Sequence, residues 1–261
     1  MPELYVMAEP LDNIRIVLVN PKAPGNIGWS ARGLKNMGLS RLYLVNPVEY
    51  PMEEVKPFAF GAEDVLKEAR VFGSLREALS EARFAVATTR RTGKHRRPSY
   101  YLRDGAARVV AAAQTNIVAV VFGGEQSGLS NEEISLCDTI VTIPHESTYP
   151  SLNLSHAVTL VCYEIYLASQ GEPLLPLLDL ASREEVEGML EHVRRALSAM
   201  GYEKEGERDV LEIITTSLKR IFGRSGLERR DVNTIRGICR RIETITALLH
   251  EERERNVPGP N

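Results

Sequence analysis

Residues 14–38 read IRIVLVNPKAPGNIGWSARGLKNMG: an apolar run, a loop containing Pro and Gly, and then a helical pattern. The run Ile14–Val19 is rich in β-branched side chains, which favours a buried strand. A helix is expected over residues 26–36, with Asn26 as a candidate cap of its N-terminus. A strand that leads into a helix in this way is typical of the βαβ units that build parallel sheets.

The same alternation continues along the next hundred residues. Apolar runs predict further strands at residues 42–45, 84–88, 117–122 and 140–143. Helical patterns lie between them and after them, at residues 74–82, 105–114, 130–137 and 153–168. Because strands that alternate with helices form crossover connections, we expect an α/β fold whose parallel sheet is covered on both faces.

The pattern changes near residue 170. Two prolines, Pro173 and Pro176, stand in a segment that reads as a linker over residues 171–180. Beyond it only helical patterns follow, at residues 182–200, 209–222 and 231–250. We therefore expect an α/β domain over residues 1–170 and a small all-helical domain over residues 181–261.

Composition excludes several classes of protein. The chain has 261 residues, a formal net charge of −3, 43% hydrophobic and 26% charged residues, which is typical of a globular protein and not of a disordered or collagen-like chain. Its longest apolar run is residues 117–122, whereas a membrane span needs about 20 residues. The N-terminus lacks the basic start and apolar core of a signal peptide. Three scattered cysteines, none in a CxxC pair, argue for a reducing cytoplasm and against a zinc site, and no metal is expected.

Three segments could carry chemistry, because each follows an expected strand and ligands of open α/β sheets bind at the carboxyl ends of strands. The first, residues 20–38, places Arg32 two turns into a helix. The second, residues 121–128 (VFGGEQSG), has two glycines directly after a strand but matches neither phosphate-loop pattern. The third, residues 143–155 (IPHESTYPSLNLS), puts Ser151 and Asn153 at a helix N-terminus, which favours anions. Ordinary strand-to-helix turns for the first two segments, and simple N-capping by Ser151 or Asn153 for the third, are the structural alternatives.

Basic residues are concentrated in two places despite the negative net charge. Five cations lie directly after one expected strand, with no acid among them: Arg90, Arg91, Lys94, Arg96 and Arg97. Residues 219–241 hold eight basic side chains against two acidic ones. A run of charge can be a solvated surface, but such clusters are also typical of contacts with a phosphate backbone.

Taken together, in this order and spacing, the segments resemble the three motifs of the SpoU/TrmH branch of the SPOUT methyltransferases. The matching stretches are GNIGWSAR, VFGGEQSGLSNEE and IPHESTYPSLNLSHA. The opening NIRIVLVNPKAPGNIGWSARGLKNMGLSRLYLVNP and the tail LKRIFGRSGLERRDVNTIRGICRRIE are most similar to the TrmJ family of tRNA 2′-O-methyltransferases. The resemblance covers residues 13–245.

This resemblance implies a fold and an activity. The SPOUT fold would place a deep trefoil knot at the carboxyl end of the α/β domain, an exception to ordinary chain topology. The knotted loops would bind S-adenosyl-L-methionine, and a homodimer would complete the site. The substrate would be the ribose 2′-hydroxyl of cytidine or uridine at position 32 of the tRNA anticodon loop, with the helical domain binding tRNA.

The resemblance also assigns residues by their positions in the motifs. The cofactor would be contacted by Thr88, Thr89, Arg90, Gly123, Ile143, Pro150, Ser151 and Leu152. The catalytic set would be Arg32, Ser151, Asn153 and Asn26. The RNA backbone would be contacted by Arg91, Lys94, Arg96 and Arg97. Pro150 stands where the family often has Ser, and it has no N–H to donate.

Chemistry constrains the role of the arginine. The guanidinium stays protonated up to a pKa above about 12, so Arg32 is better suited to clamp the target nucleotide than to act as a base. Two alternatives stay open: an rRNA 2′-O-methyltransferase with the same motifs, and a knotted RNA-binding protein without catalysis. The helical tail favours the tRNA enzyme, and the joint presence of Arg32, Ser151 and Asn153 favours catalysis. An enzyme of nucleoside triphosphates or dinucleotides would need a phosphate motif that this sequence lacks.

Overall fold

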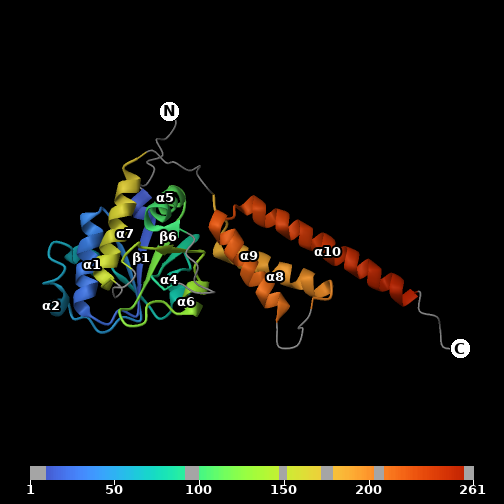
Figure 1. The fold of residues 1–261 in the computed structure, drawn as a ribbon, viewed down its shortest axis with the longest axis horizontal. Coiled ribbons are helices and arrows are strands. Elements are labelled where there is room, and N and C mark those ends of the chain that lie inside the picture. Colours follow the sequence, from blue (N-terminus) through green and yellow to red (C-terminus); the bar gives the residue numbers. More distant parts are fainter. Residues whose placement is uncertain (1–9, 92–99, 147–151, 172–178, 203–208, 256–261) are drawn as a thin grey trace. The chain divides into compact units, whose positions relative to one another are not determined.

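A computed structural model describes residues 10–91, 100–146, 152–171, 179–202 and 209–255 (Figure 1). The chain divides into two compact units, Met1–Asp179 and Leu180–Asn261. The first unit is built on a sheet and the second on helices, and each is described by itself.

In the first unit, the described strands form one seven-stranded sheet in the order β3-β2-β1-β6-β4-β7-β5. All of its strand pairs are parallel. The strands are β1 (Ile14–Val19), β2 (Arg41–Val45), β3 (Arg70–Phe72), β4 (Phe84–Thr88), β5 (Tyr100–Tyr101), β6 (Val118–Gly123) and β7 (Thr139–Thr142). The prediction of an α/β fold with a parallel sheet is therefore confirmed.

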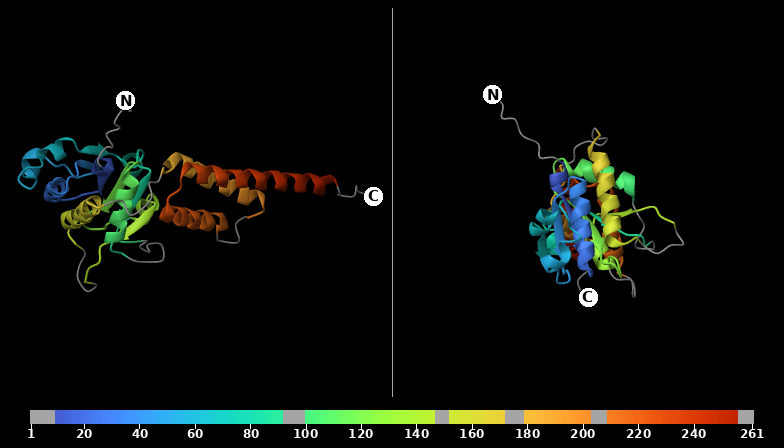
Figure 2. Two further views of the ribbon diagram at one scale, coloured as in Figure 1. Left: turned by 90° about the horizontal axis from the view of Figure 1, so that it is seen from above. Right: turned by 90° about the vertical axis from the view of Figure 1, so that its left-hand side faces the viewer.

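Helices cover both faces of this sheet. They are α1 (Pro24–Asn36), α2 (Met52–Val55), α3 (Glu63–Lys67), α4 (Leu75–Ala78), α5 (Leu102–Ala113), α6 (Asn131–Ser135) and α7 (Leu154–Ser169), after a short 3-10 turn η1 (Pro10–Asn13). On one face, Val17 and Val19 pack in a core cluster with Leu75 of α4 and Ile134 of α6. On the other face, α7 lies between α1 and α5, and the views of Figure 2 show α1 and α7 side by side.

Strand positions agree with the sequence pattern to within one residue for all five predicted strands. The structure adds two short strands, β3 and β5, which lie at the two edges of the sheet. They hold three and two residues, so neither contains the apolar run that marks a buried strand. Pairing with β2 and β7, rather than local sequence, makes these residues strands.

The start of α1 differs from the prediction. The helix begins at Pro24, with Ala23 at the N-cap position and no side-chain cap. The expectation that Asn26 caps this helix is wrong, because Asn26 lies inside the first turn and is buried. Proline suits the first turn of a helix, since its missing N–H would have no partner there.

The order of strands creates a divergence at the centre of the sheet. β1 leads into α1 on one face, and β6, its neighbour, leads into α6 on the other face. At such a point the loops after two adjacent strands separate, and open α/β sheets bind ligands in the resulting crevice. The first two candidate segments follow β1 and β6, so they begin next to each other at this end of the sheet.

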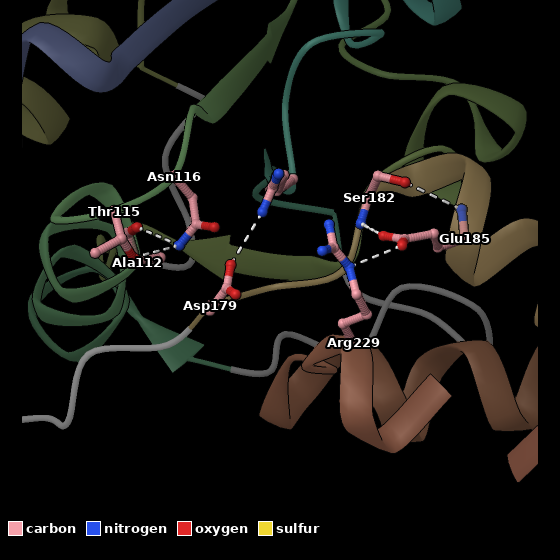
Figure 3. Close-up of polar contacts among 8 residues, drawn as sticks. Ala112, Thr115, Asn116, Asp179, Ser182, Glu185 and Arg229 are labelled. Atoms are coloured by element: carbon pink, nitrogen blue, oxygen red, sulfur yellow. Dashed lines mark hydrogen bonds and ion pairs between the residues drawn. The ribbon is translucent and has the colours of Figure 1, made fainter. Parts of the chain in front are cut away.

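The second unit consists of α8 (Arg183–Ala199), α9 (Val210–Ser225) and α10 (Arg229–Arg255). Its small core holds Ala181, Met189 and Val232, with partly buried Phe222 and Ile235 packed against them. The helix α8 begins with a capping box, in which the Ser182 side chain and the Glu185 side chain each accept the other's backbone N–H. Glu185 also binds Arg229 at 3.0 Å, which ties the start of α8 to the start of α10 (Figure 3).

Among the described residues, no helix combines the length and the apolar character that crossing a membrane requires. The three cysteines, Cys137, Cys162 and Cys239, are free and buried. Burial raises the pKa of the Cys162 thiol far above its usual value, so this thiol is inert at neutral pH.

Candidate active site

A chain of hydrogen bonds joins the three candidate segments. Asn26 Nδ2, on α1, donates to Glu125 Oε1 in the loop after β6 at 2.7 Å. Asn153 Nδ2, at the start of α7, donates to Asn26 Oδ1 at 3.0 Å. Asn26 therefore sits between the other two side chains and fixes the orientation of both.

Glu125 anchors the loop that leads into α1. Its carboxylate accepts the backbone N–H of Lys22 at 2.9 Å and of Ala23 at 3.1 Å, in addition to the bond from Asn26. Burial raises the pKa of the Glu125 carboxyl, but these hydrogen bonds outweigh burial and hold its pKa below the usual value. The carboxylate is therefore ionised at neutral pH and stabilises the entry to α1.

Sequence reasoning did not select Glu125. The residue stands in the quoted segment VFGGEQSG, directly after two glycines, but nothing local indicates its partners. A lone carboxylate in a turn is usually solvated. The partners of Glu125, which are Asn26, Ala23 and Lys22, lie 99 or more positions away in sequence, so only the folded structure reveals its role.

Asn153 is the N-cap of α7, one of the two candidates, Ser151 and Asn153, that the sequence left open. Its Oδ1 accepts the backbone N–H of Ser155 at 2.9 Å and the Ser155 hydroxyl at 2.7 Å. Because the carboxamide oxygen caps the helix while the amide nitrogen binds Asn26, the side chain has one defined orientation. Capping and a site role are thus compatible at this residue.

Gly123 and Gly124 are explained by the fold of their own loop. A Cβ on Gly123 would collide with the backbone of Gly128 and Leu129, and one on Gly124 would lie 2.5 Å from the Asn20 carbonyl oxygen. The loop closes on itself through a bridge between Gly124 and Gly128, which has a φ of +64°. The interpretation as a tight turn therefore accounts for both glycines, and a bound ligand is not needed to explain them.

Arg32 lies two turns into α1 and is half-buried. Its guanidinium carbon is 5.6 Å from the centre of the Trp29 ring. Within the part of the chain that the structure describes, this guanidinium has no hydrogen-bond or ion-pair partner. Its five N–H donors are therefore available to an anionic ligand.

The predicted cofactor residues that the structure describes lie at neighbouring strand ends. The strand β4 ends at Thr88, and Thr89 and Arg90 follow it. Its two neighbours in the sheet are β6 and β7. Gly123 is the last residue of β6, and Ile143 directly follows β7. Thr88 Oγ1 donates to the Val121 carbonyl at 2.9 Å, and the Thr89 N–H donates to Val141 at 3.1 Å. These bonds fix the strand ends.

Leu152, just before the Asn153 cap, is an apolar side chain that is 40% exposed. Arg91 is exposed, and its backbone N–H donates to Thr89 Oγ1 at 3.1 Å. The remaining site predictions, Pro150, Ser151, Lys94, Arg96 and Arg97, lie outside the described residues.

In the second unit, the basic segment is partly neutralised. Arg229 pairs with Glu185 at 3.0 Å and Arg230 with Glu228 at 2.9 Å. Three exposed arginines, Arg220, Arg240 and Arg241, make no ion pair or hydrogen bond through their side chains within the described residues. These three are the cations best placed to bind an external anion.

Comparison with known proteins identifies the class. Residues 13–163 match the model of the SpoU rRNA Methylase family, and they span the sheet and all three segments described above. The chain belongs to this family of methylases. Residues 184–255 match a second model, described as tRNA methyltransferase TrmJ, C-terminal domain. Within the SpoU methylases, the chain is thus a member of the TrmJ family.

Individual relatives agree over nearly the whole chain. The tRNA (cytidine/uridine/adenosine-2′-O-)-methyltransferase TrmJ of Pseudomonas aeruginosa is 36% identical, over 93% of this chain and 98% of its own length. The tRNA (cytidine/uridine-2′-O-)-methyltransferase TrmJ of Pectobacterium atrosepticum is 35% identical, over 89% and 98%. The crystal structure of TrmJ from Z. mobilis superposes with a TM-score of 0.69 at 32% identity, over 88% of this chain and 98% of that one.

Proposed function

We propose that this protein transfers a methyl group from S-adenosyl-L-methionine to a ribose 2′-hydroxyl of tRNA, at cytidine or uridine 32 of the anticodon loop. The observation that carries the proposal is the Glu125–Asn26–Asn153 chain, which joins the three methylase segments. Arg32, on the same helix as Asn26, has no hydrogen-bond or ion-pair partner among the described residues. The relatives also support the proposal, because TrmJ proteins that align with this chain over 98% of their own length are named as tRNA 2′-O-methyltransferases.

The residues at the ends of β4, β6 and β7 fit the cofactor. Leu152 offers an exposed apolar surface to an adenine ring, and Ile143 is half-exposed at the neighbouring strand end. Hydrogen bonds to Val121 and Val141 hold Thr88 and Thr89 at this end of the sheet, where their backbone would make polar contacts with the cofactor. When bound, S-adenosyl-L-methionine supplies an electrophilic methyl group on a good leaving group, so no metal is required. Arg90, Gly123, Pro150 and Ser151 would complete the proposed pocket through backbone contacts, with Pro150 contributing no N–H.

The residues of this chain position the nucleotide. Arg32 clamps the target phosphate and the 2′-hydroxyl with its planar fork of donors. Asn153, held by Asn26 and by its own helix cap, and Ser151 orient the ribose or Arg32. A phosphate oxygen or a water accepts the hydroxyl proton, because the guanidinium is already protonated. Alignment of a hydroxyl with the methyl carbon is the main contribution the protein makes to the rate.

A homodimer is part of the proposal. Three apolar side chains on the outer face of α7, Leu160, Tyr163 and Leu167, are each more than 40% exposed. They recur at helical spacing, so they form one stripe, and an apolar stripe of this kind is typical of an interface. A trefoil knot at the carboxyl end of the α/β unit and a cytoplasmic location belong to the same proposal.

The second unit would hold the tRNA. Arg220, Arg240 and Arg241 lie on α9 and α10, and RNA phosphates would supply the counter-charges that the described residues do not. In the first unit, Arg91, Lys94, Arg96 and Arg97 would contact the backbone near the anticodon loop. The proposed domains are residues 1–170 for methyl transfer and residues 181–261 for tRNA binding, joined by the linker at residues 171–180.

Methyl transfer from labelled cofactor to unmodified total tRNA and, separately, to rRNA tests the proposal. We expect label in tRNA, mapped to the ribose of nucleotide 32, and none in rRNA. Label in rRNA alone would favour the alternative rRNA enzyme. No transfer to either RNA, with cofactor and RNA both bound, would indicate a non-catalytic RNA-binding protein.

A further inference from the structure

Two aromatic side chains form an exposed pair beside Arg32. Trp29 of α1 and Phe58, which follows α2, have ring centres 6.0 Å apart at an interplanar angle of 57°. Trp29 is 45% exposed and Phe58 37%. Large aromatic rings are normally mostly buried, so a pair that stays open to solvent at a candidate site suggests a binding surface.

The pair is built into the fold rather than placed on a loose loop. A Cβ on Gly28 would lie 2.7 Å from the Phe58 Cβ, and the Phe58 ring lies 3.6 Å from where a Cβ on Gly25 would stand. The two glycines of α1 thus let Phe58 seat directly on the helix backbone. Figure 1 shows α2, which Phe58 follows, beside α1. Phe58 in turn supports the Trp29 ring.

The charge beside the rings decides between two occupants. If an apolar face of a second copy covered Trp29, it would also desolvate the adjacent Arg32, which has no acidic partner among the described residues. A nucleotide would satisfy both groups, because its phosphate would neutralise the Arg32 guanidinium while its base would cover the exposed Trp29 ring. An aromatic ring next to an arginine is a combination that single-stranded RNA favours.

We propose that Trp29 and Phe58 form a stacking platform for an unstacked nucleobase of the RNA substrate, next to the nucleotide that Arg32 clamps. This inference rests on the proposed function and goes beyond it, because it assigns the stacking of a base to Trp29 and Phe58, which are not in the proposed catalytic set. Stacking tolerates every base, so the platform contributes affinity and position rather than base identity.

Fluorescence provides a direct test, since Trp29 is the only tryptophan of the 261 residues. Excited at 295 nm or above, where RNA absorbs little, the full chain should lose emission as an unmodified anticodon stem-loop is added, with the midpoint at the Kd measured by filter binding. A stem-loop in which the target and neighbouring loop nucleotides are abasic should bind without the quenching. If the Trp29 emission per protein molecule changed with protein concentration but not on addition of RNA, Trp29 would lie between two copies of the chain, and the proposal would be overturned.

Kinetics of variants provide the second test. Trp29→Leu keeps an apolar side chain but removes the π-face, so we expect KM for the stem-loop to rise roughly 10-fold or more while cofactor affinity is unchanged. Trp29→Phe should restore most of the loss. Phe60→Ala is the matched control: Phe60 is 73% exposed, two residues from Phe58, and makes no ring contact within the described chain. A Trp29→Leu enzyme with the wild-type KM would overturn the proposal.

The two proposals fail in different ways. If wild-type protein does not methylate tRNA, the proposed function is wrong. If it methylates tRNA, but RNA does not change the Trp29 emission and the Trp29→Leu variant has the wild-type KM for the stem-loop, only the stacking platform is wrong.

Discussion

Asn153 donates a hydrogen bond of 3.0 Å to Asn26, although 127 positions separate the two residues in sequence. The bond joins the start of the last helix of the α/β unit to the first helix. Because Asn26 also binds Glu125, both asparagine side chains are held in one orientation without any ligand. Such preorganisation is the property that a site for methyl transfer to a hydroxyl needs.

Arg32→Ala should leave cofactor affinity nearly unchanged and reduce methyl transfer by about 10²–10³-fold or more, the effect of removing a positioned charged group. The stability should change by about 0.5 kcal/mol or less, since the guanidinium has no hydrogen-bond or ion-pair partner among the described residues. Single-turnover methylation of an anticodon stem-loop measures the loss. Arg32→Lys should recover little, because an ammonium does not reproduce the planar fork. Activity within threefold of wild type in the Ala variant would remove Arg32 from the site.

Glu125→Gln should destabilise the first unit by about 1–3 kcal/mol, because a carboxamide presents one donor group to the N–H groups of Lys22, Ala23 and Asn26. The effect should depend on pH. The pKa of Glu125 is lowered in the folded protein, so its stabilisation is complete above the unfolded pKa and is lost as pH falls through the folded value.

Urea unfolding of wild type and Glu125→Gln checks this prediction. The two midpoints should be well separated at neutral pH, begin to approach each other as the pH falls below about 4.3, the ordinary value for a glutamate, and converge only below the lowered pKa of Glu125 in the folded protein. Glu132→Gln is the control, since Glu132 is an exposed acid on α6 in the same unit. A difference between wild type and Glu125→Gln that stayed constant across this range would contradict a role of the ionised carboxylate.

Gly33 and Thr159 provide a test of the contact between α1 and α7. A Cβ on Gly33 would lie 2.5 Å from Thr159 Oγ1, which is tighter than real contacts allow. Gly33→Ala should therefore destabilise by about 1–3 kcal/mol through overpacking, despite the better helix propensity of alanine. Thr159→Ala removes the clashing oxygen and should restore much of the loss in the double variant. A double-mutant cycle with no coupling would show that the two helices separate easily.

The α7 stripe predicts the oligomeric state. Leu160→Asp together with Leu167→Asp should give a monomer by sedimentation and abolish methyl transfer, because charges would replace two exposed apolar contacts of the proposed dimer. Phe60→Asp, at a more exposed apolar position of the same unit, should leave the dimer intact. A fully active 29.1 kDa monomer of the wild-type protein would contradict the dimer.

The arginines of the second unit that have no ion-pair partner among the described residues predict a salt effect. Arg240→Ala with Arg241→Ala should weaken tRNA binding and reduce the dependence of log Kd on log salt by about 0.7–0.9 for each lost phosphate contact. Arg230→Ala is the matched control, because Arg230 already pairs with Glu228 at 2.9 Å. Equal slopes for the wild type and the double variant, measured between 50 and 200 mM salt, roughly the range over which such binding changes most, would place these two side chains in solvent.

The amino-acid sequence by itself determined the elements whose signals are local. Ile14–Val19 and the other apolar runs form the predicted strands, because burial of β-branched side chains needs only a run of neighbours. Asn153 caps α7 through the N–H of Ser155, a partner two positions away. The motifs and their spacing also determined the family, since all three segments lie on one chain in one order.

Only the tertiary structure decided how those segments meet. Asn26 is a good local cap by its residue type, yet its partners are Glu125 and Asn153, which the strand order β1-β6-β4-β7 brings to it. The edge strands β3 and β5 exist because β2 and β7 pair with them. The physical reason is range: propensities and caps act over a few residues, whereas a hydrogen bond across 99 or 127 positions depends on which strands lie side by side.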